Sequence, residues 1–196
     1  MSVALFDPPP SYLPIGLGPY RAEDYAELPD EPRCELILGR FYLTPSPFPP
    51  HQLIASLIWK LLYAMARRTG GRAFIAPLDV TLADHSVVQP DVIYITSERK
   101  EIVGERGIFG IPDLVVEVLS FGTSRRDRGE KLGLYAQSGV REYWIVDPIS
   151  KQIEFLVNRD GAFVVVLPEG AIYRSPALAG VEIDLAAFWA EVAEAL

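Results

Sequence analysis

The sequence contains few of the residues that form disulfides and zinc sites. It has one cysteine, Cys34, and two histidines among its 196 residues. A single cysteine excludes an internal disulfide and is typical of a reducing compartment, so we expect a cytoplasmic protein. A structural zinc site usually takes four cysteine or histidine ligands, and these three residues are too few to provide them.

Long hydrophobic runs are also missing. Although 49% of the residues are apolar, no uninterrupted apolar run has the length of a membrane span. The N-terminus carries Asp7 and Pro8-Pro9-Pro10, where a signal peptide would have basic residues and an apolar run. We therefore expect no membrane segment. Length and composition favour an irregular arm over residues 1–19 and a single domain over residues 20–196.

Positive charge is scarce overall, with 18 lysines and arginines against 26 acids and a net charge of −8. This argues against a nucleic-acid partner, because non-specific affinity for phosphates comes mainly from cations. Binding depends on local potential, however, and the cations are not evenly spread. Arg125, Arg126, Arg128 and Lys131 fall within seven positions.

Hydrophobic periodicity predicts a mixed α/β sheet with helices before and after it. The clearest helix covers 51–69, with an apolar stripe at i, i+3, i+4 spacing and a stop at Gly70-Gly71. Turn residues 158–161 predict a hairpin. Further helices are expected at 21–28, at 123 or 124 to 137, and at 185–196. Strands are expected at 35–43 (two short ones), 72–76, 78–83, 91–96, 114–119, 141–146, 152–157 and 162–167.

Acidic residues stand at or beside three of these strands. Glu35 opens one strand, Asp91 opens the run Val92-Ile93-Tyr94-Ile95, and Glu117 interrupts the most apolar run of the chain. A buried acid is costly unless something neutralises it. Magnesium or manganese can do so, since both prefer oxygen ligands. Carboxylates on a sheet, followed by a helix start rich in cations, favour metal-assisted cleavage of a phosphodiester.

Each of these residues also has a structural interpretation. Asp91 follows a proline and could be a turn residue, as could Asp113 in a second Pro-Asp pair. Glu117 could simply pair with Arg126 or Lys131. Lys131 could be the surface partner of Asp127, four residues earlier.

Other residues fit supporting or packing roles. His51, at the start of the long helix, fits a capping or supporting role better than that of a ligand. Cys34, Tyr135, Tyr143 and Trp144 fit packing.

Taken together, the motifs identify a resemblance. The chain resembles the Uma-type bacterial family of restriction-endonuclease-like proteins, in the PD-(D/E)XK nuclease-like superfamily, from about residue 20 to 147 and more loosely to 188. The matching segments are Cys34-Glu35-Leu36-Ile37-Leu38-Gly39, Thr44-Pro45-Ser46-Pro47, Gln89-Pro90-Asp91-Val92, residues 112–120, Asp127-Arg128, Lys131, Tyr135 and residues 139–148. The resemblance implies a restriction-endonuclease-like core, a mixed β-sheet flanked by helices.

The resemblance also implies roles for individual residues. Asp91 and Glu117 would bind Mg²⁺ or Mn²⁺, with the backbone carbonyl of Val118 as a further ligand. Glu35 would hold a metal-bound water or a second metal. The superfamily pattern has a lysine two residues after the second acid, where this chain has Leu119. In related variants the following helix supplies the lysine, and here that candidate is Lys131.

The implied activity is hydrolysis of DNA, with double-stranded DNA as the expected partner. Arg125, Arg126 and Arg128 would hold its phosphates, and a homodimer is compatible because related nucleases often pair to cut two strands. Two alternatives remain open. The acidic net charge and Leu119 favour a catalytically inactive interaction or regulatory module. A metal-dependent phosphoesterase acting on another substrate is the third possibility.

Overall fold

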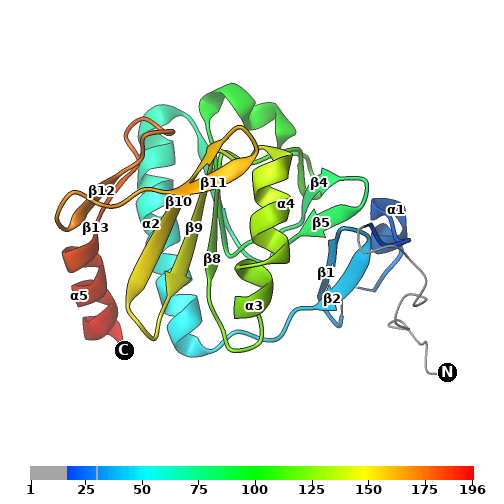
Figure 1. The fold of residues 1–196 in the computed structure, drawn as a ribbon, viewed down its shortest axis with the longest axis horizontal. Coiled ribbons are helices and arrows are strands. Elements are labelled where there is room, and N and C mark those ends of the chain that lie inside the picture. The colour runs from blue at the N-terminus through cyan, green and yellow to red at the C-terminus, as the bar shows by residue number, and fades with distance from the viewer. Residues whose placement is uncertain (1–16, 30) are drawn as a thin grey trace.

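In the computed structural model, the described residues form a six-stranded mixed sheet at the centre of the fold (Figure 1). The structure describes residues 17–29 and 31–196, so most of the predicted arm lies outside the described residues. Strand order is β11-β10-β9-β8-β6-β3, with β8 and β9 parallel and the other neighbours antiparallel. The strands are β3 Arg72–Ile75, β6 Val92–Ile95, β8 Leu114–Val118, β9 Glu142–Asp147, β10 Gln152–Arg159 and β11 Ala162–Val165.

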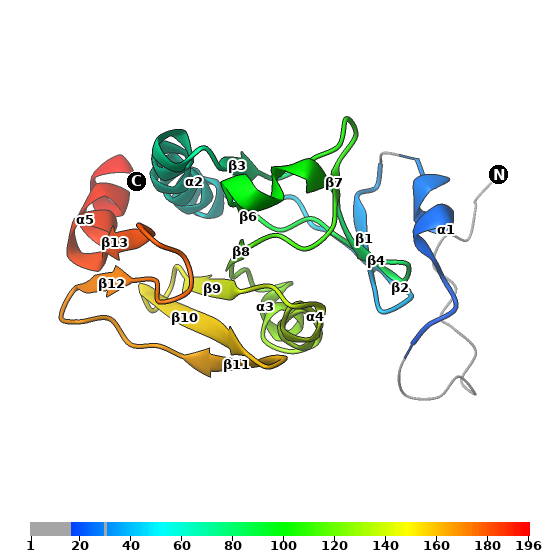
Figure 2. The same cartoon turned by 90° about the horizontal axis from the view of Figure 1, so that it is seen from above.

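Helices cover both faces of this sheet, as Figure 2 shows. The helices are α2 Pro49–Thr69 and α5 Leu185–Ala195 on one face, and α3 Ser124–Asp127 and α4 Glu130–Ser138 on the other. Strand β8 lies in the middle, and its side chains alternate between the two faces. Val116 and Val118 join the core beneath α2, whereas Val115 joins the core beneath α4. By the same alternation, Glu117 lies on the α4 face.

The long helix was predicted well, although it begins two residues earlier, at Pro49. Proline suits the first turn of a helix because its missing N–H would have no intrahelical partner there. Gly70 ends the helix with φ 78°, as predicted. Ile54, Ile58 and Leu62 are buried on one stripe. This stripe fixes which face of α2 packs against the core.

The helix predicted from 123 or 124 to 137 is wrong as a single element, because it is broken into α3 and α4. The break falls at Gly129, whose φ of −120° and ψ of −97° are not helical. A Cβ at Gly129 would lie 2.9 Å from the carbonyl oxygen of Arg125, so glycine permits this close approach. The side chain of Thr123 does not cap α3 and instead hydrogen-bonds to that of Ser120. The two short helices form the crossover between the parallel strands β8 and β9.

A second sheet carries the early acid, with strand order β2-β1-β5-β4-β7. Its strands are β1 Cys34–Ile37, β2 Arg40–Leu43, β4 Val80–Ala83, β5 Ser86–Val88 and β7 Ile108–Phe109. The predicted pair at 35–43 is confirmed as β1 and β2, joined at Leu38-Gly39 with positive φ at both residues. The short strands β5 and β7 were not predicted, and neither was the small sheet of β12 Ile172–Arg174 and β13 Glu182–Asp184.

The remaining predicted elements also have counterparts. The hairpin of β10 and β11 turns at Asp160 and Gly161, both with positive φ. Residues 21–28 contain the short helix α1 Ala22–Ala26, and residues 97–102 form a turn of 3-10 helix. Among the described helices, none is both long enough and apolar enough to cross a membrane.

Candidate active site

The four residues predicted to be catalytic line one cavity of about 280 Å³. Glu35 comes from β1, Asp91 precedes β6, Glu117 lies on β8 and Lys131 on α4. The walls of the cavity also include the start of α2 and the loop 120–123 after β8. The fold therefore brings together residues that are up to 96 positions apart in the sequence (131 − 35).

Asp91 and Glu117 are neighbours across two central strands. Val92 pairs with Val116 in the antiparallel ladder of β6 and β8. Extending this register by one residue sets Asp91 opposite Glu117, and opposite residues of such a pair have Cβ atoms about 5 Å apart on the same face. The Asp91 carboxylate also accepts a hydrogen bond from the backbone N–H of Val118, at 2.7 Å. Strand pairing thus holds two carboxylates side by side.

Lys131 reaches these carboxylates from α4. Its Nζ lies 2.8 Å from Oε1 of Glu117 and 2.8 Å from Oε1 of Glu35. Only 4% of the Lys131 residue is exposed, so it is not a surface partner of Asp127. Leu119, where the superfamily pattern has its lysine, packs into the apolar core beneath α4. The cation beside Glu117 therefore comes from a helix rather than from the strand.

Glu35 is almost completely surrounded by donors. Its Oε1 accepts hydrogen bonds from the backbone N–H of Gln89 and from Lys131, each at 2.8 Å. Its Oε2 lies 3.9 Å from the guanidinium of Arg126. Because 2% of Glu35 is exposed, these contacts replace water as its charge partners. The Glu35 carboxylate is thus well placed to orient the Lys131 ammonium.

His51 supports Asp91 from the N-terminal turn of α2. Its Nε2 lies 3.1 Å from Oδ2 of Asp91. Burial by itself lowers the pKa of His51, but the hydrogen bond and charge of Asp91, together with the Val118 backbone, raise it overall. His51 therefore holds its proton more firmly than a free histidine and contacts the Asp91 carboxylate. This contact fits the supporting role that the sequence suggested.

Two further residues contact the cluster and were not among the predicted site residues. The hydroxyl of Tyr135 donates a hydrogen bond to Oε1 of Glu117 at 2.8 Å. Asp127 lines the cavity, and its buried Oδ1 makes no hydrogen bond to the described residues, lying 3.7 Å from Lys131 Nζ. Lys131 and Tyr135 lie four residues apart on α4, which is the spacing of one helix face, whereas Asp127 lies on α3 before the break. That spacing was a signal available in the sequence.

Burial and like charges shift the titration of the cluster. Burial raises the pKa of Glu117 well above its ordinary value; Lys131 opposes this shift, whereas Asp127, Asp91 and Glu35 add to it. Burial likewise raises the pKa of Asp127, again against Lys131. For Lys131, burial lowers the pKa, but the neighbouring carboxylates raise it overall. Lys131 thus stays charged. One lysine cannot neutralise both Glu117 and Asp127, so these two carboxyl groups either keep a net negative charge or bind protons.

The three arginines predicted to bind phosphate differ in their surroundings. Arg126 stacks over the Tyr42 ring, 4.4 Å from its centroid, and faces Glu35. Arg128 is paired with Glu154 on β10 at 2.5 Å. Arg125 is exposed, and within residues 17–29 and 31–196 it forms no ion pair. Of the three, Arg125 is therefore the one whose charge is available at the surface.

The carboxylates in the cavity suit a hard divalent cation only if a backbone carbonyl and water molecules complete its set of ligands. Over the described part of the chain, no group of three or more histidine, cysteine, aspartate or glutamate side chains could hold a metal ion. Four carboxylates nevertheless share the cavity with one lysine, and Asp127 Oδ1 has no donor. An all-oxygen set of few side chains suits Mg²⁺, which usually keeps several of its waters. Asp91 and Glu117, with the Val118 carbonyl, are such a set.

The mixed sheet flanked by helices is a restriction-endonuclease-like fold. It is similar to the crystal structure of a protein from Anabaena variabilis ATCC 29413 described as "a putative nuclease belonging to DUF820". The two share a TM-score of 0.73 and 19% sequence identity, over 89% of this chain and 99% of that chain. At this identity the likeness concerns the fold.

The family follows from the sequence match. Residues 22–186 match the Uma2 family, described as "Putative restriction endonuclease", and the chain belongs to this family. The resemblance drawn from the motifs is thereby confirmed. A comparison with curated proteins finds no match.

Proposed function

We propose that the protein is a metal-dependent endonuclease that hydrolyses phosphodiester bonds of DNA. The observation that carries this proposal is the convergence of Glu35, Asp91 and Glu117 with the buried Lys131 in one cavity. Membership of a family described as restriction endonucleases supports the same class of activity. Buried charges are costly unless they are paired, and perturbed carboxylates in a cavity are typical of catalytic sites.

Asp91, Glu117 and the Val118 carbonyl would hold the metal. Magnesium or manganese, when bound, would polarise the phosphate and lower the pKa of the attacking water. The hydrogen bond from Val118 N–H and the contact with His51 keep the Asp91 carboxylate oriented. Tyr135 and Lys131 share Oε1 of Glu117, which leaves its other oxygen available as a ligand.

Lys131 would act on the reacting groups. Its ammonium can position the attacking water or stabilise the negative charge that develops on the phosphoryl oxygens. Glu35 binds the same ammonium and would act as a positioning residue, although it could also orient a metal-bound water. The raised pKa of Lys131 favours the charged form, which suits charge stabilisation better than proton removal.

The mouth of the cavity offers contacts for a nucleic acid. Phe48 and Phe121 line it and are 70% and 106% exposed, so their rings are free to stack on bases. Arg33 lines the cavity, and Arg125 lies on α3 directly after its wall. These groups form a local surface that can accept DNA despite the net charge of −8.

Cleavage of plasmid and single-stranded DNA with magnesium, manganese or EDTA tests the proposal. We expect cutting with either metal and none with EDTA. Linear product from one encounter would support a homodimer that cuts both strands, whereas nicked circles alone would support a monomer. If no metal supports cleavage while the protein still binds a partner, the interaction-module alternative replaces the nuclease.

A further inference from the structure

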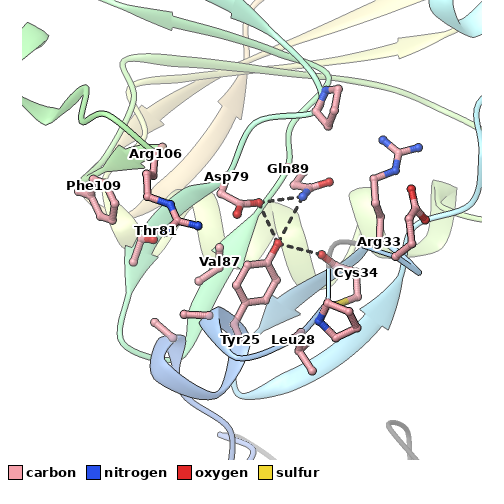
Figure 3. Close-up of a pocket in the computed structure, with 16 residues that line it drawn as sticks. Tyr25, Leu28, Arg33, Cys34, Asp79, Thr81, Val87, Gln89, Arg106 and Phe109 are labelled. Atoms are coloured by element: carbon pink, nitrogen blue, oxygen red, sulfur yellow. Dashed lines mark hydrogen bonds between the residues drawn. The ribbon is translucent and has the colours of Figure 1, made fainter. Parts of the chain in front are cut away.

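A second cavity, of about 640 Å³, lies beside the candidate active site (Figure 3). It lies among α1, β1, β4, β5 and the segment 106–109. Arg33 and Gln89 line both cavities. The size is in the range of ligand sites, roughly 300–1,000 Å³. The shared residues place the two cavities next to each other.

A hydrogen-bond network of Tyr25, Asp79 and Gln89 forms the polar part of this cavity, and Figure 3 shows the Tyr25 hydroxyl at its centre. Oδ1 of Asp79 accepts from the hydroxyl of Tyr25 and from Nε2 of Gln89, each at 2.8 Å. Burial, followed by Asp79, raises the pKa of Tyr25, which keeps the phenol protonated as a donor. Among the described residues, Oδ2 of Asp79 has no donor, so it remains an acceptor for a ligand.

Gln89 adds a buried acceptor and a link to the catalytic cluster. Because its Nε2 donates to Asp79, the amide orientation is fixed and Oε1 faces elsewhere. Among the described residues, that oxygen is buried and has no hydrogen-bond partner. A buried acceptor without a donor costs about 1–3 kcal/mol. The backbone N–H of the same residue donates to Glu35.

Two arginines flank the network without acidic partners. Arg33 and Arg106 lie on opposite sides of Asp79 and Gln89 in Figure 3. In the described part of the chain neither forms an ion pair, although the protein carries 26 acids against 18 basic residues. Unpaired guanidinium groups at a cavity are suited to phosphate. The apolar part of the cavity wall includes Leu28, Val87 and Phe109, which is 59% exposed.

We propose that this second cavity binds one unpaired nucleotide of a DNA strand. An N–H group of its base donates to Asp79, and Arg106 and Arg33 hold its phosphate. The strand continues past Arg33 into the active-site cavity. The strand as the source of the nucleotide rests on the proposed function, whereas affinity for a nucleotide does not. A donor-bearing base is favoured because the free oxygen of Asp79 is an acceptor.

Calorimetry with deoxynucleoside monophosphates in EDTA tests the cavity without any cleavage. We expect dAMP, dCMP and dGMP to bind the wild type. Asp79→Asn should weaken binding about tenfold, the loss of one charge-assisted hydrogen bond. Arg106→Gln, at an exposed position that folding tolerates, should weaken it at least threefold. Arg21→Gln is the matched control, because Arg21 is exposed and pairs with Asp84 outside the cavity. No binding by wild type, or equal binding by all variants, overturns the proposal.

A second experiment, with an oligonucleotide, tests whether the bound nucleotide belongs to a DNA strand. A single-stranded DNA with one 2-aminopurine should gain fluorescence on binding in EDTA, because the base leaves its stacked neighbours. Arg106→Gln should remove that gain. Mononucleotide binding without any fluorescence change would overturn the strand as source. If the protein binds nucleotides but does not cleave DNA, only the proposed function is contradicted. If it cleaves DNA but does not bind nucleotides, only the inference about this cavity is contradicted.

Discussion

Lys131 on α4 and Glu117 on β8 meet 2.8 Å apart across the face of the sheet that α4 covers. The pair is buried, with 4% of each residue exposed. The spacing of Lys131 and Tyr135 puts both side chains on the helix face that meets Glu117. A helix therefore supplies the cation that the superfamily pattern takes from the strand.

Lys131→Met should abolish most cleavage while keeping the aliphatic packing. A loss of about a hundredfold or more in kcat fits removal of a group that stabilises the transition state. Leaving Glu35 and Glu117 buried without their cation should also lower stability, by about 3–5 kcal/mol. Rates are compared at a temperature where melting curves show both proteins folded. Lys60→Met is the control, since Lys60 is exposed and pairs with Glu191. Wild-type rates in Lys131→Met would exclude a catalytic role.

Magnesium or manganese should raise the melting temperature of the wild type. A cation that binds only the folded state stabilises it by mass action, and it relieves repulsion between Asp91 and Glu117. The double variant Asp91→Asn, Glu117→Gln should lose this gain. Calorimetry gives the affinities directly. Glu130→Gln, at an exposed position on α4, should keep the affinity of the wild type. Equal affinity in the double variant would contradict the metal site.

Arg125→Ala should reduce the salt dependence of DNA binding more than Arg128→Ala. Each phosphate contact contributes about one to the slope of log affinity against log salt. Arg125 is exposed and unpaired within the described residues, whereas Arg128 is already held by Glu154. Fluorescence anisotropy over a salt series, in calcium to limit cleavage, gives the slopes. The triple change of Arg125, Arg126 and Arg128 should flatten the slope by up to about three. Unchanged slopes in all variants would place the phosphates elsewhere.

Phe121→Ala should weaken single-stranded DNA binding without changing the salt slope. Stacking of a base on an aromatic ring contributes about 1–3 kcal/mol, roughly five- to a hundredfold in affinity. The ring is 106% exposed at the cavity mouth, so its loss leaves the fold intact. Ile149→Ala is the control, since Ile149 is 95% exposed and apolar but does not line the cavity. An equal effect in both variants would argue against stacking.

Glu142 should make a pH-dependent contribution to stability away from the active site. Burial raises its pKa above the ordinary 4.5, although hydrogen bonds from Ser175, Trp144 and Tyr173 lower it in part. The folded state therefore keeps a proton that the unfolded state has lost. The resulting stabilisation is complete below pH 4.5 and is lost as the pH rises through the folded pKa.

A comparison with Glu142→Gln isolates this contribution. The stability of the wild type relative to the variant should fall as the pH rises from 4.5, because the variant has no carboxyl group to titrate. Urea unfolding at several pH values measures the difference. A difference that stays constant with pH would mean that Glu142 is ionised in both states.

The two Pro-Asp pairs mark the limit of what could be predicted from local sequence. Asp91 lines the active-site cavity beside Glu117. Asp113 is completely buried, accepts a hydrogen bond from the backbone N–H of Thr96 and lies 3.3 Å from Arg141. Both aspartates follow a proline and precede a strand. They differ only in the tertiary structure. The pairing of β6 with β8 makes Asp91 a candidate metal ligand, whereas Asp113 is a structural acid.

Local periodicity determined most of the elements of this protein. The stripe of α2, the apolar run of β8 and the turn at 158–161 each follow from spacing that neighbouring residues set by themselves. The motifs likewise indicated the family and the four residues that share the cavity. The tertiary structure decided the break at Gly129, the pairing of Arg128 with Glu154, and the contacts of Asp127 and Tyr135 with the cluster. These depend on which faces meet after the β8–α4–β9 crossover closes, and no local spacing encodes that packing.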